Sequence, residues 1–95
     1  MSMEVQSMML NDVKWESPVI ISLENGAPRT FTGAYEAFDF LQHEWPSRHG
    51  KVYEQALRLC RASLMGSVGG EIARIAFIEA SRDAHCLVEG RKLAS

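Results

Sequence analysis

The sequence lacks the features that mark membrane, secreted and disulfide-bonded proteins. No apolar run approaches the roughly 18 residues that a membrane-spanning helix needs. The first ten residues lack the basic start and apolar stretch of a secretory signal. The two cysteines, Cys60 and Cys86, stand far apart and outside any CxxC pair, which is typical of a reducing compartment. We therefore expect a cytoplasmic protein with no disulfide and no membrane contact.

Metal-binding and nucleic-acid-binding signatures are also scarce. The spacings among His43, His49, His85 and the two cysteines reproduce no zinc motif, so we predict no metal and no cofactor. The net charge is −2 and the pI is about 5.9, whereas nucleic-acid-binding domains often have a pI above about 9. This balance disfavours nucleic-acid binding. Residues 1–46 carry −5 and residues 47–95 carry +3, so the two halves could attract each other within the fold or across a subunit contact.

The chain is long enough for one small core. At 95 residues and 46% hydrophobic, it fits a single globular domain. We assign residues 13–90 to this domain, residues 1–12 to a disordered or weakly docked leader, and residues 91–95 to a frayed tail.

Short β-branched segments predict the strands. The segment 18–23 predicts one strand. Asn25-Gly26-Ala27-Pro28 is typical of a turn, and residues 29–32 after it predict a second strand that completes a β-hairpin. The apolar segment 86–89, bounded by Gly90, predicts a third strand that closes the sheet.

Three amphipathic segments predict helices over about 33–44, 51–65 and 69–84. Pro46 disfavours helical geometry at Trp45 and so ends the first helix. Gly66 is placed to cap the second, whose apolar stripe includes Cys60. Along the third, a small-residue line consists of Ala73, Ala76, Ala80 and Ala84. The predicted fold class is α+β, a short antiparallel three-stranded sheet packed against three helices in the order ββαααβ.

Scattered residues also point to a family. They are Trp15, Pro18-Val19, Ala37 with Leu41 before Trp45-Pro46, Tyr53, Ala56, Cys60, Gly66, and Ala73-Arg74 followed by Ala76-Phe77-Ile78 and Ala80. Over residues 13–88 this succession resembles the bacterial family of domains of unknown function numbered 982. The resemblance implies a small α+β domain with helices against a short sheet, and it implies no reaction, ligand or catalytic residue.

Three groups of residues are candidates for function. Arg58, Arg61 and Arg74 could bind a small anion, although Arg74 sits among apolar neighbours, where an arginine commonly pairs with a carboxylate or carbonyls of its own chain. Trp45-Pro46 could present an aromatic surface to a partner or plug the core beneath a connector. Cys60 could act as a nucleophile, but its place on the apolar stripe favours packing.

Together these observations predict a small, non-catalytic binding or self-association module. Small sheets expose edges and small domains have limited cores, so we expect a homodimer or an unknown protein partner. The alternative is a small-anion or metabolite sensor that uses the three arginines. A cysteine-dependent enzyme is a third hypothesis.

Overall fold

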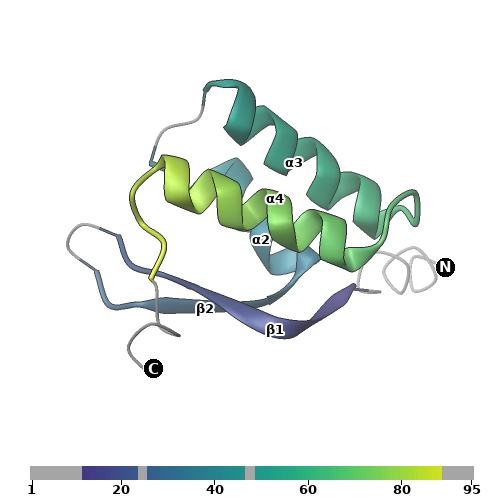
Figure 1. Cartoon of the computed structure of the whole chain (residues 1–95), viewed down its shortest axis with the longest axis horizontal. Helices are drawn as coiled ribbons and strands as arrows, with labels where there is room; N and C mark the ends of the chain where they lie inside the picture. Colours follow the sequence, from purple (N-terminus) through teal and green to yellow (C-terminus); the bar gives the residue numbers. More distant parts are fainter. Residues whose placement is uncertain (1–11, 24–25, 47–48, 89–95) are drawn as a thin grey trace, which may run out of the picture.

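The structure is a computed structural model that describes residues 12–23, 26–46 and 49–88. Its elements run in the order ββααα: β1 (Lys14–Ile21), β2 (Arg29–Gly33), α2 (Ala34–His43), α3 (Lys51–Leu64) and α4 (Gly70–Asp83). The predicted hairpin and the three helices are confirmed. In Figure 1 the helices all lie on one side of the hairpin, and α3 runs alongside α4.

The hairpin buries one face, as its alternation predicts. Trp15, Val19 and Ile21 are buried in β1, and Phe31 is buried in β2. Val19 pairs with Phe31 in antiparallel register. Pro18, which has no N–H to give to a ladder, lies in the stretch between Lys14 and Val19 where the register shifts.

The predicted third strand is wrong, because the sheet of the described residues has two strands. The cause lies in how α4 ends. His85 adopts a left-handed conformation, with φ at 61°, and the Cys86 N–H donates to the Ser81 carbonyl at 2.9 Å. In an antiparallel strand the N–H and C=O of a residue point to the same neighbour. Because the Cys86 N–H donates to the Ser81 carbonyl at the end of α4, it is not available to donate to β1 as it would in a strand.

What remains of the third strand is a single bridge. Leu87 pairs with Ile21 in antiparallel fashion, and the Val88 N–H donates to the Ile20 carbonyl at 2.9 Å. Glu89, the last residue of the predicted strand, lies outside the described residues, as do residues 1–11 of the predicted leader and the tail 91–95. The bridge holds the end of α4 against β1.

The start of α2 depends on the segment before β1. Asp12 Oδ1 accepts the Tyr35 N–H at 2.8 Å, and the Val13 carbonyl accepts the Ala34 N–H at 2.9 Å. These bonds satisfy two of the amides that a helix N-terminus leaves without intrahelical partners. Gly33 makes room for them, because a Cβ there would lie 2.6 Å from Asp12 Oδ2 and 3.0 Å from the Val13 carbonyl oxygen.

The end of α3 follows the sequence prediction. Gly66 has a φ of 84°, a conformation that glycine adopts without strain. The Ser67 N–H donates to the Ala62 carbonyl at 2.8 Å, which closes the last turn in the manner of a Schellman motif. The chain then reverses, so α4 runs antiparallel to α3.

Aromatic rings fill the space between the sheet and the helices. Phe77 of α4 is fully buried, and its ring lies 5.1 Å from Phe31, 5.6 Å from Trp45 and 5.8 Å from Trp15. Among the described elements α4 packs on β1, α2 packs on β2, and α3 packs mainly on α2 and α4. One side of the α3–α4 pair thus faces away from the core.

Candidate interaction surface

Small residues let α3 and α4 approach closely. Ala56 and Cys60 of α3 are fully buried, as is Ala73 of α4, and the Cys60 Sγ lies 4.0 Å from the Ala73 carbonyl oxygen. This is the packing role that the apolar stripe predicts for Cys60. Its burial raises the pKa of the Cys60 thiol to about 12, so the thiol is protonated at neutral pH. Activated cysteines have lowered pKa values, and the environment of Cys60 does the opposite.

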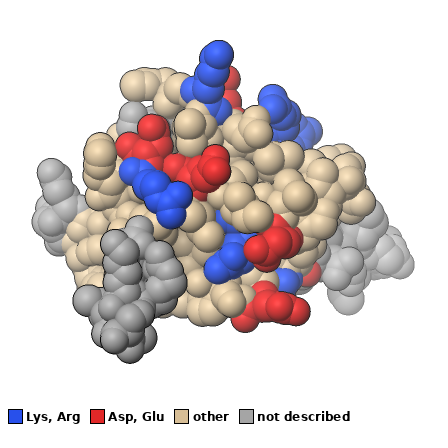
Figure 2. All heavy atoms as spheres, viewed as in Figure 1, with Lys and Arg blue, Asp and Glu red and all other residues tan. Residues whose placement is uncertain are grey.

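The larger apolar residues beside this seam are left partly exposed. Ile72 and Ile75 of α4 remain 47% and 46% exposed. They flank a groove of about 420 Å³ that runs between α3 and α4; its lining is Lys51, Val52, Gln55, Leu59, Ile72, Ile75, Ala76 and Glu79. We call this groove and its two exposed isoleucines the α3–α4 face. In Figure 2 a band of uncharged atoms crosses this side of the molecule between groups of charged side chains.

The sequence pattern did not mark these isoleucines. It indicated a small-residue line of Ala73, Ala76, Ala80 and Ala84 as the packing side of α4; the first three are buried, and Ala84 is half-buried. Ile72 and Ile75 are spaced three residues apart and lie beside that line. Large apolar residues at helical spacing outside a small-residue line are a signal that could have marked the second, unpartnered stripe.

Two opposite charges line one end of the groove. Lys51 begins α3 and Glu79 lies near the end of α4, and these two ends are neighbours because the helices are antiparallel. The ion pairs among the described residues join other groups: Lys14 to Asp12, Arg29 to Glu44, His43 to Asp39, and Arg74 to Glu71. Within residues 12–23, 26–46 and 49–88, Lys51 and Glu79 are therefore not engaged in ion pairs.

The three predicted anion-binding arginines have different surroundings. Arg74 donates from Nε to the Ser17 carbonyl at 2.7 Å and from Nη1 to Glu71 at 3.2 Å, so its side chain ties α4 to β1. Arg58 donates to Gln55 on its own helix at 3.0 Å, and Arg61 is exposed. Arg74 thus has the intramolecular partners expected of a structural arginine. A role for the three in anion binding stays a prediction.

Trp45 and Pro46, the predicted partner-binding pair, are placed differently from each other. Trp45 is 5% exposed, and its ring lies 5.8 Å from Phe40 and 5.6 Å from Phe77. Its indole therefore packs in the core, which is the plug expected of a residue beneath a connector. Pro46 is exposed. A role for the pair in partner binding stays a prediction.

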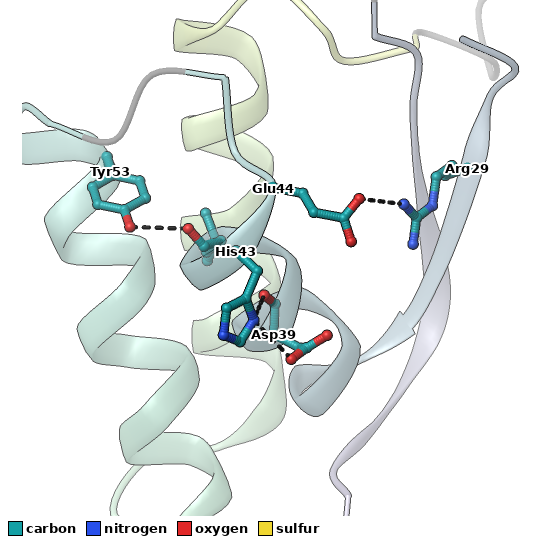
Figure 3. Close-up of polar contacts among 6 residues, drawn as sticks. Arg29, Asp39, His43, Glu44 and Tyr53 are labelled. Atoms are coloured by element: carbon teal, nitrogen blue, oxygen red, sulfur yellow. Dashed lines mark hydrogen bonds and ion pairs between the residues drawn. The ribbon is translucent and has the colours of Figure 1, made fainter.

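Polar contacts gather near the end of α2 (Figure 3). The Tyr53 hydroxyl donates to the Leu41 carbonyl at 2.9 Å and so links α3 to α2. The His43 Nδ1 lies 3.1 Å from Asp39 Oδ1, with both side chains more than half exposed. Arg29 lies 3.3 Å from Glu44. Exposed pairs of this kind contribute little to stability.

The described residues hold no cluster of three or more His, Cys, Asp and Glu side chains that could bind a metal ion. Across the same part of the chain, the helices are too short or too polar to span a bilayer. Over residues 12–23, 26–46 and 49–88, the structure is a small α+β domain whose α3–α4 face is left partly exposed.

Comparisons with known proteins agree with this class. Residues 17–88 match the family described as "Protein of unknown function (DUF982)", and the chain belongs to this family. A protein of Agrobacterium tumefaciens, whose structure was solved by NMR, is 76% identical in sequence. The match covers 84% of this chain and 80% of that one, with a TM-score of 0.72. No curated protein matches the chain. The bacterial family resemblance predicted from the sequence is confirmed.

Proposed function

We propose that this domain is a non-catalytic binding module whose contact surface is the α3–α4 face. The observation that carries the proposal is the near-half exposure of Ile72 and Ile75 beside an apolar groove in a domain of this size. Exposed apolar side chains gathered along a groove and rimmed by polar residues are typical of a protein interaction site.

The chemistry of the described residues supports binding over catalysis. Burial raises the pKa of both cysteines, and burial of this kind leaves a thiol protonated and unreactive. The His43–Asp39 pair lies on an exposed helix surface, outside the residues that line the groove. A catalytic base is more commonly placed in a concave site that excludes water.

The proposal is tested by removing the apolar groups without disturbing the core. Tagged wild-type protein, the I72S/I75S variant and a Y35S control are expressed in Agrobacterium tumefaciens, because a close relative comes from that organism. Tyr35 is 38% exposed on α2, away from the groove, so Y35S removes a comparable exposed apolar group.

Proteins retained by each form are compared by cross-linking and mass spectrometry. We expect a specific protein, either another copy of the chain or a different one, to be retained by wild type and Y35S and lost from I72S/I75S. Equal retention by all three forms contradicts the assignment of the surface. Circular dichroism confirms that each variant is folded.

A further inference from the structure

We propose that the occupant of the α3–α4 face is the same face of a second copy of this chain. The two-fold axis runs along the helices, so α3 of each copy packs antiparallel on α4 of the other and the four helices form a bundle. This inference rests on the proposed function, since it names the partner of that surface.

The shape of the face suits a two-fold contact. In such a contact one patch must supply both the protruding group and the recess that receives it. The α3–α4 face has both, because Ile72 and Ile75 are about half exposed and border a groove of about 420 Å³ that Val52 and Leu59 also line. Insertion of these isoleucines into the groove of the other copy removes apolar surface from water on both sides.

The charges on the face select the orientation. Lys51 of α3 and Glu79 of α4 line the same end of the groove, and neither has an ion-pair partner among the residues that the structure describes. A two-fold axis along the helices places α3 of one copy against α4 of the other. The start of each α3 then lies against the end of the facing α4. Lys51 of each copy then faces Glu79 of the other, and the symmetric contact contains this pair twice.

The other simple orientation is less favourable. An axis that runs across the helices places Lys51 and Glu79 of one copy against the Ile72 end of the other. The groove lining at that end, Leu59 and Ile72, is uncharged, so both charges lose water there without a counter-charge in the groove, which costs free energy. Opposite charges that meet across an interface also fix its register and exclude wrong pairings.

Charge reversal tests this arrangement. K51E places two acids against each other at both symmetric positions, and E79K places two bases there. We expect the dimer Kd of each variant to rise about tenfold or more in sedimentation equilibrium, from the loss of two attractions and the gain of two repulsions. E54K is the matched control, because Glu54 is exposed on α3 but does not line the groove, and its Kd stays near that of wild type.

Mixing the two variants gives the decisive result. An equimolar mixture of K51E and E79K restores opposite charges at both positions, so a heterodimer forms with a Kd near that of wild type, and the K51E/E79K double variant self-associates again. A mixture that stays monomeric, or single variants that dimerise like wild type, overturns the arrangement.

The two proposals fail in different ways. If purified wild-type protein stays monomeric from micromolar to millimolar concentration, this contradicts the proposal that a second copy of the chain occupies the α3–α4 face. The proposed function still stands if a different protein is retained in cells through Ile72 and Ile75, and it fails if I72S/I75S retains the same proteins as wild type.

Discussion

Asp12 controls the start of α2, and replacing it by alanine should destabilise the domain measurably. Its Oδ1 accepts the N–H groups of Tyr35 at 2.8 Å and Val13 at 2.7 Å, and the side chain is only 16% exposed. Loss of a side chain that caps a helix N-terminus costs about 0.5–2 kcal/mol. The Asp12 carboxylate also lies at the positive end of the α2 dipole, which adds about 0.3–1 kcal/mol.

We therefore expect D12A to lower the free energy of unfolding by about 1–2 kcal/mol. For a domain of this size, each 1 kcal/mol shifts Tm by about 4–8 °C. Thermal and urea unfolding followed by circular dichroism measure the change.

Two further variants separate the causes. D12N keeps an oxygen that can accept the Tyr35 N–H, so it should retain most of the stability. K14A removes the ion pair at 3.5 Å, whose lysine is 68% exposed, and should cost less than about 0.5 kcal/mol. A D12A protein as stable as wild type, or a K14A loss as large as that of D12A, would refute the capping role.

Four other predictions concern Tyr53, Cys60 and Arg74. Y53F removes the hydroxyl that bonds the Leu41 carbonyl and should cost about 0.5–1.5 kcal/mol in urea unfolding; no loss argues against that bond. Cys60, with its pKa raised from 9.0 to about 12, should react with iodoacetamide far more slowly in the folded protein than in urea; equal rates contradict its burial. The same raised pKa means that stability is full below pH 9 and falls as the pH rises from about 9 toward about 12, because only the unfolded thiol ionises there; C60A should flatten this fall. R74A should lose about 1–3 kcal/mol with no dependence on phosphate, since Arg74 holds the Ser17 carbonyl; a phosphate-dependent Tm shift lost in R74A would instead support the anion sensor.

Local chemistry determines most of what the sequence could predict. The hairpin follows from the alternation of Val19 and Ile21, and the end of α2 follows from Pro46 three residues beyond the helix. Gly66 caps α3 as expected, because a left-handed residue is needed there and glycine adopts that conformation freely. Each of these depends on residues close together in the chain.

The predictions from the sequence fall short where a distant residue or a competing hydrogen bond determines the local structure. Asp12 reaches a helix that begins 22 residues later, and no local pattern records that contact. The third strand was predicted from the apolar residues 86–89, but the end of α4 takes the Cys86 amide and leaves one bridge. An amide that could serve either a helix end or a strand cannot be assigned from composition.

The candidate surface was harder to predict than the core. Alanines and Cys60 on the facing sides of α3 and α4 indicate close packing, and the structure confirms it. The sequence periodicity does not say how far Ile72 and Ile75 remain exposed, because that depends on which helix covers them. Their exposure became apparent only when the neighbours of α4 were known.

An NMR concentration series on the ¹⁵N-labelled wild-type domain tests self-association through the α3–α4 face most directly. From micromolar to millimolar concentration, we expect the amide signals of Gln55, Ile72 and Ile75 to shift and broaden while those around Tyr35 stay fixed. Signals that do not change with concentration, or changes centred on α2 and the hairpin, would contradict self-association through the α3–α4 face.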